Sequence, residues 1–366
     1  MTIAQAIARQ VETADTRGRA GEFVNLCRCR AMAEFTKQPP AKVAAQQGLT
    51  QRVQKILSDP NVLVVKAAVA PMQLPQAVLA DYESVAAGFL ETLRNVGCFD
   101  RILADGGWRQ VPMRTRVVVV TVGASAGALG EPVSLTPLTS LLLANQNLAL
   151  RIATTAVILS NELWRAADAE AQALVQRELS SGAALVTDQQ MVAELTGGIT
   201  AMTSNGATAT AIQQDFARLF GAVTLGQNSR PYILMQSHNA KALATKDAPT
   251  TFEVLFPTMG PMGGTIANVP VLVCDGLSAG QIVLVDAAQV AAASAPDLAI
   301  DTVRQGDVQL DTAPDSPPLT TTVLTSMWQH NLTGLRVMRR FGIERLTTTA
   351  VAVLSGANYA TSNSPP

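Results

Sequence analysis

Apolar residues in the first sixty positions recur at helical spacing. Ile3, Ile7 and Val11 stand four residues apart, which predicts a helix with one narrow apolar stripe. A second helix is predicted just before Pro39, and a third over residues 42–56. Stripes this thin favour an arm that packs against other parts of an assembly over a domain with its own core.

The next part of the chain changes to extended patterns. The β-branched run Arg116–Val122 predicts a strand, and small residues and prolines follow it. A second extended segment, PVSLTPLTSLLL, covers residues 132–143, and we expect a long hairpin or excursion between the two segments. Another extended apolar stretch covers Leu148–Leu159, followed by a long helix or a kinked pair of helices over residues 160–196.

From about residue 200 the pattern becomes α/β, with short elements. Residues 320–355 then hold long extended segments. The expected elements between these points are a helix over Ala209–Leu225, a strand over Tyr232–Met235, a helix from His238 capped by Ser237, and strands over Val269–Cys274 and Ile282–Val285.

Length and composition narrow the class of protein. A chain of 366 residues predicts two or three domains. Hydrophobic residues make up 48% and charged residues only 15%, where about 25% charged is usual. The formal net charge of −1 excludes a strongly basic nucleic-acid binder, and the apolar content excludes general disorder. Because long charge-free stretches, such as residues 132–150, contain proline and amides, we expect no membrane span. The shortage of charge instead favours a surface covered by copies of the same chain.

One motif could carry chemistry. Residues 123–127 read G-x-S-x-G directly after the predicted strand, as at the nucleophile of serine hydrolases. Ser125 would be the nucleophile and His330 the base. The orienting acid would be one of Asp275, Asp286 and Asp301.

The sequence after this motif argues against a nucleophile. A helix must follow such a serine, but Pro132, Pro137 and β-branched residues disfavour one. The glycines also lack the spacing of a phosphate-binding loop. We therefore interpret the segment as the tip of an extended loop, with Gly123, Ser125, Gly127, Gly130 and Glu131 at its end.

Cysteine and histidine are too sparse to predict a cofactor or metal site. Cys27 and Cys29 are closer together than zinc ligands usually stand, and Cys98 and Cys274 lie far apart along the chain. Only two histidines occur. We expect free thiols, no bound metal, no cofactor and no catalytic residues.

A cluster of charge stands out near the C-terminus of this charge-poor chain. If residues 336–345 form a strand, Arg336 and Arg340 share one face and Arg339 the other. The cluster is either ordinary surface charge or a set of salt bridges between subunits, for which arginine is well suited. The candidate intersubunit contacts are Trp328, Arg336, Arg339, Arg340 and Glu344.

The order of these parts resembles a known family. The closing segment carries a Trp-Gln pair at 328–329, an L-R-x-x-R stretch at 335–339, an aromatic at Phe341 and a short apolar strand ending at Gly356. The segment GGTIANVPVLVCDGLSAGQIVLVDAAQV adds a glycine turn, a strand and a G-x-I-V-L-x-D order. Over residues 85–360 the chain is similar to the major capsid proteins of tailed bacteriophages, which have the Hong Kong ninety-seven capsid fold.

The resemblance implies an α+β fold with an N-terminal arm, an extended β-hairpin loop, a peripheral domain with a long spine helix, and an axial α/β domain. The implied divisions are a helical arm region at 1–85, arm continuation and extended loop at 86–137, the peripheral domain at 138–199, the axial domain at 200–318, a return through the peripheral domain at 319–346, and an axial strand and tail at 347–366.

The resemblance also implies a function. The chain would assemble with itself into pentamers and hexamers of an icosahedral shell, in the host cytoplasm, and would lie in the virion. Packaged double-stranded DNA would be a non-specific partner, with portal, scaffold or decoration proteins as further partners. Some relatives cross-link a loop lysine to an asparagine, but this chain has no lysine between Lys66 and Lys241, so no such bond is expected. The alternatives are an encapsulin-like nanocompartment shell and the serine hydrolase with Ser125 and His330.

Overall fold

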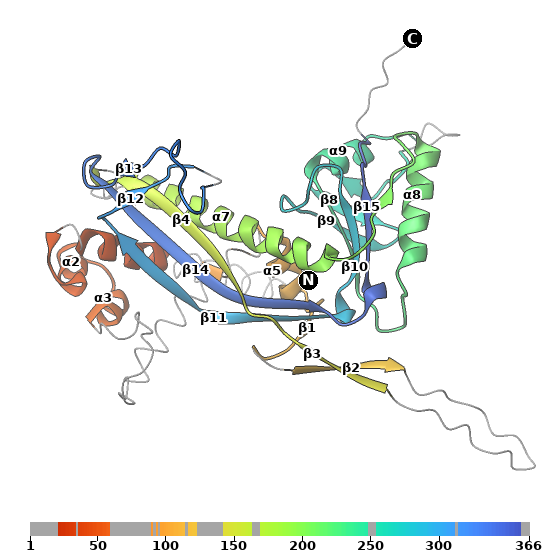
Figure 1. The fold of residues 1–366 in the computed structure, drawn as a ribbon, viewed down its shortest axis with the longest axis horizontal. Helices are drawn as coiled ribbons and strands as arrows, with labels where there is room; N and C mark the ends of the chain where they lie inside the picture. The colour runs from red at the N-terminus through yellow and green to blue at the C-terminus, as the bar shows by residue number, and fades with distance from the viewer. Residues whose placement is uncertain are drawn as a thin grey trace, which may run out of the picture. The chain divides into compact units, whose positions relative to one another are not determined.

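The structure of this chain is a computed structural model (Figure 1). Its described parts form helices and mixed sheets, so the expected α+β class is confirmed. The described residues are 21–33, 36–58, 89–90, 93, 96–113, 116–122, 142–162, 169–247, 254–311 and 314–359.

The chain divides into two compact units, and each combines three separate stretches of sequence. Unit 1 comprises Met1–Val96, Ile152–Val186 and Ala295–Arg340; unit 2 comprises Gly97–Arg151, Thr187–Ser294 and Phe341–Pro366. The domain boundaries expected from the sequence stay predictions.

Unit 1 is built on long strands. Figure 1 shows β4, β14 and β11 running side by side, in a four-stranded sheet of order β1-β11-β14-β4. Their residues alternate between inside and outside: in β14, Leu335 and Val337 are buried while Arg336 between them is exposed. The elements with residues in unit 1 are α2 (Pro40–Gln46), α3 (Gln51–Ser58), β4 (Arg151–Ser160), the start of α7 (Ala169–Thr196), the end of β11 (Val290–Val303), β12 (Asp307–Val308), β13 (Thr325–Ser326) and most of β14 (Leu332–Arg345).

The N-terminal helices share one core with this sheet. The helical residues 21–33 are tied to β11 by Arg30, whose Nη1 donates to the Ile300 carbonyl at 2.9 Å. Each fully buried large apolar side chain contributes about 1.5–3 kcal/mol relative to an exposed one. Members of this core include Phe23, Leu26, Val43, Ile56, Leu179, Leu298 and Leu335.

Unit 2 centres on a seven-stranded sheet of order β5-β15-β10-β6-β9-β8-β7. The central strand β10 is buried at every residue and pairs antiparallel with both β15 and β6. The elements with residues in unit 2 are α5 (Cys98–Ala104), β1 (Arg109–Gln110), β2 (Arg116–Val122), β3 (Leu142–Asn147), the end of α7, β5 (Met202–Thr203), α8 (Ala209–Ala222), β6 (Pro231–Met235), α9 (Ser237–Ala244), β7 (Met259–Gly260), β8 (Gly263–Ile266), β9 (Val269–Val273), β10 (Ile282–Asp286), η1 (Ala287–Gln289), the start of β11, the end of β14, η2 (Thr348–Ala350) and β15 (Val351–Ser355).

Buried carboxylates organise the turns of unit 2. Asp215, fully buried in α8, accepts from Ser204 Oγ at 2.6 Å, from the Asn205 N–H at 3.0 Å and from the Tyr359 hydroxyl at 3.1 Å. Burial first, and then the Asp215 charge, raise the pKa of Tyr359. Asp286 accepts from Ser229 Oγ at 2.6 Å and from the Arg230 N–H at 2.8 Å. These bonds offset the cost of burying each charge.

Three expected elements differ in detail from the structure. The third helix predicted over 42–56 is two helices, α2 and α3, because the chain turns through Gly48 at φ +65°. Helix α8 ends at Ala222, since Val223 is extended. Helix α9 begins at Ser237, which is therefore not its cap; Gln236 holds that position, and its side chain donates to the Leu277 carbonyl at 2.8 Å.

The expected hairpin is present. β2 pairs antiparallel with β3, with Arg116 opposite Asn147. The extended stretch predicted over Leu148–Leu159 is confirmed for most of its length, because β4 begins at Arg151 and runs through it in the four-stranded sheet. The loop-tip residues Gly123, Ser125, Gly127, Gly130 and Glu131 lie outside the described residues.

We expect Gly276→Ala to destabilise the chain. A Cβ at this position would lie 2.7 Å from the backbone of Asp188 and Gln189 in α7, and backbone cannot yield as a side-chain end can. The expected loss is about 1–3 kcal/mol of unfolding free energy, measured by chemical denaturation. Gly221→Ala in α8 is the matched control, because nothing lies within 4 Å of its Cβ, and it should be neutral or slightly stabilising. Equal stability of the two variants would contradict this account.

A candidate assembly surface on unit 1

Exposed apolar side chains are concentrated in one segment of unit 1. Of the twelve large apolar residues that are exposed among the described residues, six fall between residues 303 and 328. Exposed apolar side chains that gather in one patch mark interaction sites. We call these six the 303–328 surface: Val303, Leu310, Leu319, Val323, Leu324 and Trp328.

The turn that carries Trp328 is anchored by a buried neighbour and by hydrogen bonds to Asn161. The Trp328 side chain is 77% exposed, whereas its neighbour Met327 is 1% exposed. Asn161, at the end of β4, is buried and donates through Nδ2 to Asn331 Oδ1 at 2.5 Å, while its N–H donates to the Asn331 carbonyl at 3.0 Å. Thr333 Oγ1 donates to Asn161 Oδ1. The turn therefore presents its tryptophan outward from a fixed base.

Polar side chains also organise the loop between β12 and β13. Gln309 and Asp315 bond reciprocally, with Gln309 Nε2 3.0 Å from the Asp315 carbonyl and the Asp315 N–H 2.7 Å from Gln309 Oε1. Thr322 Oγ1 donates to Asp315 Oδ2 at 2.6 Å and accepts from the Leu319 N–H at 2.8 Å. These bonds leave Val323 and Leu324 facing outward, 78% and 51% exposed.

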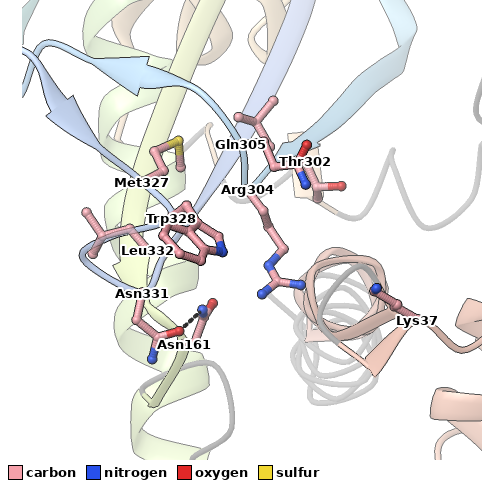
Figure 2. Close-up of a pocket in the computed structure, with 10 residues that line it drawn as sticks. Lys37, Asn161, Thr302, Arg304, Gln305, Met327, Trp328, Asn331 and Leu332 are labelled. Carbon is pink, nitrogen blue, oxygen red and sulfur yellow. Dashed lines mark hydrogen bonds between the residues drawn. The ribbon is translucent and has the colours of Figure 1, made fainter.

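A basic cavity of about 560 Å³ borders Trp328. Figure 2 shows Arg304 extending from the end of β11 toward the segment that bears Lys37, with the indole of Trp328 on the same cavity. None of the described residues that line it is acidic. They are Lys37, Asn161, Thr302, Val303, Arg304, Gln305, Met327, Trp328, Asn331 and Leu332.

A second cavity of about 700 Å³ lies on the same segment and has the opposite charge. It is mostly apolar, and its two charged residues are Asp307 and Asp311. Its described lining contains no lysine or arginine. The lining residues are Ala156, Ile158, Asp307, Val308, Gln309, Leu310, Asp311, Pro314, Pro318 and Leu324.

The candidate intersubunit residues of the charge cluster differ in how exposed their side chains are. Arg336 is exposed and pairs with Asp301 within its own chain, Nη2 to Oδ2 at 2.6 Å. Arg339 is only 2% exposed, because it points to the inner face of β14, so its side chain cannot reach a second copy. Arg340 and Glu344 are half-buried. Of the candidates named from the sequence, Trp328 projects furthest into solvent.

The hydrolase hypothesis gains no support from the described residues. Ser125 lies outside them. His330 Nδ1 is 3.0 Å from the Ser326 carbonyl of its own turn. Two of the candidate acids are engaged elsewhere, Asp301 with Arg336 and Asp286 with Ser229 and Arg230.

Three buried groups of metal-ligating type meet in unit 2. The ligand atoms of Cys98, Asp188 and Cys274 lie within 4.8 Å of one another. Both Asp188 oxygens are occupied as helix-cap acceptors, from the Cys98 N–H at 2.8 Å and the Phe99 N–H at 2.9 Å. The hydrogen bond with Cys274 and then burial raise the pKa of Cys98, which keeps it a thiol. Asp188 therefore caps α5, and Cys98 Sγ donates to the Val273 carbonyl at 3.1 Å.

Sequence reasoning missed most of the 303–328 surface. It named Trp328 but not Leu310, Leu319, Val323 or Leu324. A signal was available, because these residues lie in the stretch 310–328, which has three prolines and no helical or strand periodicity. Apolar residues without a period cannot all turn toward one core.

In comparison with known proteins, the chain is similar in sequence to a phage protein. No family model matches the sequence. The chain is 28% identical over 363 residues to a protein named "Capsid polyprotein" from Pseudomonas phage PAJU2, a match that covers 92% of this chain and 54% of that protein. The chain thus spans about half the length of this relative. The resemblance to phage capsid proteins is confirmed.

Solved structures align with this chain at low sequence identity. A chain from Microbacterium phage Oxtober96 aligns with a TM-score of 0.47 at 10% identity, covering 80% of this chain and 96% of that one. A chain from "Capsid of empty GTA particle computed with C5 symmetry" aligns with a TM-score of 0.46 at 15% identity, covering 87% and 99%. A chain from Mycobacterium phage Ogopogo aligns with a TM-score of 0.44 at 14% identity, covering 68% and 90%.

Among the helices that the structure describes, none combines the length and the apolar character needed to cross a bilayer.

Asn161→Ala should loosen the Trp328 turn and destabilise unit 1. The change removes the hydrogen bonds that Asn161 makes with the side chains of Asn331 and Thr333, at an expected cost of about 1–3 kcal/mol. Chemical denaturation followed by tryptophan fluorescence measures the loss. Gln305→Ala is the control, since it lines the same cavity but is exposed and should change stability by less than about 0.5 kcal/mol. An unchanged Asn161→Ala variant would show that the turn is held by other contacts.

Glu344 should make the chain less stable as pH rises. Burial and then the Glu194 carboxylate raise the pKa of Glu344, so the folded state binds its proton more tightly than the unfolded state does. The cost of ionising Glu344 is therefore absent below the unfolded pKa and grows as pH rises through the folded pKa. Glu344→Gln should raise the melting temperature at pH 7 and lose this advantage at pH 4. Glu178→Gln, at an exposed site, should show no such pH dependence.

Proposed function

We propose that this chain is a structural capsid protein that assembles with itself into a closed icosahedral shell. The observation that carries the proposal is the similarity over 92% of the chain to a phage protein named capsid polyprotein. The 303–328 surface supports it, because a chain with 15% charged residues and a concentrated exposed apolar segment has surface to bury against other copies. This function needs no catalytic site.

The finer features follow from the resemblance to tailed-phage capsid proteins. The copies form pentamers and hexamers, the shell lies in the virion after assembly in the host cytoplasm, and it encloses double-stranded DNA held without sequence preference. Portal, scaffold or decoration proteins act as further partners. The shell is held by non-covalent contacts, since residues 67–240 contain no lysine for a loop cross-link.

Electron microscopy of the purified chain tests this proposal. We expect negative-stain images to show rings or closed shells, and size-exclusion chromatography to show a large assembly. Boiling the particles in SDS should return single chains, because no covalent link joins them. Shells that hold protein cargo and no nuclease-protected DNA would favour the nanocompartment alternative. A chain that stays monomeric at high concentration, alone and with the phage's other head proteins, would overturn the proposal.

A further inference from the structure

The two cavities of unit 1 are complementary in charge. One is lined by Lys37 and Arg304 and contains no acidic residue among its described lining. The other is lined by Asp307 and Asp311 and contains no basic residue there. Surfaces with matched opposite charge steer association and fix its register.

The two cavities also differ in polarity, and a large aromatic side chain projects beside one of them. Trp328 projects from the rim of the basic cavity, 77% exposed, and tryptophan and arginine are the residues that most often dominate binding energy at protein interfaces. The acidic cavity has an apolar wall that includes Leu310 and Leu324, 59% and 51% exposed, and a volume of about 700 Å³. An aromatic side chain that packs against such an apolar wall removes about 150–250 Å² of its surface from water.

We infer that the basic, Trp328-bearing cavity of one copy docks onto the acidic cavity of a second copy of this chain. Trp328 of the first copy packs on Leu310 and Leu324 of the second, while Lys37 and Arg304 face Asp307 and Asp311. The inference rests on the proposed function, because it assigns a contact within the shell.

A second copy is the partner that this complementarity fits, because one copy cannot bring its own two cavities together. Both are lined mainly by the stretch from the end of β11 to the start of β14, and backbone bonds fix that stretch: the Met327 N–H donates to the Gly306 carbonyl at 3.1 Å, and β12 pairs with β13. Each copy therefore binds one neighbour through its basic cavity and another neighbour through its acidic cavity. Such head-to-tail contacts close into rings when the rotation between copies allows.

Cysteine pairing between two populations of full-length chains tests the contact. Trp328→Cys and Leu310→Cys chains, one carrying a size tag, are co-assembled and then oxidised with oxidised glutathione. Because the four native cysteines are buried, the introduced thiols dominate the reaction. We expect a disulfide-linked band that contains one chain of each kind. The control pairs Trp328→Cys with Met262→Cys, which is equally exposed at 79% but lies in unit 2, and should give no such band.

Charge reversal tests the register of the same contact. Lys37→Glu and Asp311→Lys should each slow assembly at low salt, and the double variant should recover it, because the reversed charges again face one another across the contact. Trp328→Ala should weaken assembly by about tenfold or more while leaving thermal unfolding of the isolated subunit unchanged, since the side chain is exposed.

The outcomes separate this inference from the proposed function. Wild-type shells that form normally, with no mixed disulfide and full assembly of Trp328→Ala, overturn the docking but leave the capsid function standing. Disulfides that join only two chains of the same kind would show that the copies meet in a different register, and would also overturn it. A wild type that never assembles overturns both.

Discussion

Removal of apolar side chains from water is the interaction on which this structure depends. With 48% hydrophobic and 15% charged residues, the chain cannot cover its exterior with charge. Much of the apolar content is used inside two separate cores, one beneath the long strands and N-terminal helices of unit 1 and one around the seven-stranded sheet of unit 2. What remains outside is not spread evenly: half of the large exposed apolar residues that the structure describes gather between 303 and 328. The high apolar content fills the cores, and the shortage of charged residues leaves part of the surface apolar and suited to binding a partner.

The few buried polar groups position the backbone. Asp188 caps α5, Asp215 gathers Ser204, Asn205 and the hydroxyl of Tyr359, and Asp286 ties the start of β6 to the end of β10. In unit 1 an amide does the same work, since Asn161 links the end of β4 to the Trp328 turn. The hydrogen bonds named here all come from neutral donors, and Asp215 has in addition the partly exposed Arg218, whose Nη1 lies 3.9 Å from its Oδ1.

The elements that could be predicted from the sequence are those in which apolar residues recur at regular spacing. Residues 116–122 and 282–285 are β-branched or apolar runs, and both form strands close to the expected bounds. The long helix and the alternation of Arg336 with buried neighbours were likewise visible in the pattern. Gly48 split a predicted helix because a positive φ leaves no mark on hydrophobic spacing. The assembly surface was mostly missed for a related reason: Gln309, Asp315 and Thr322 hold the loop through side-chain bonds between positions six and seven apart, which no periodic rule detects.

The rigid base of the Trp328 turn affects how wrongly oriented contacts between copies are corrected. An interface made by a flexible loop must be strong, because ordering the loop consumes part of its free energy. Asn161 and the buried Met327 order this turn when the subunit folds, so two copies that meet there lose little further conformational entropy. A contact of this kind can be weak and still have a defined geometry. Copies that join in the wrong orientation then dissociate quickly, and a large closed surface can grow by repeated trial without trapping its mistakes.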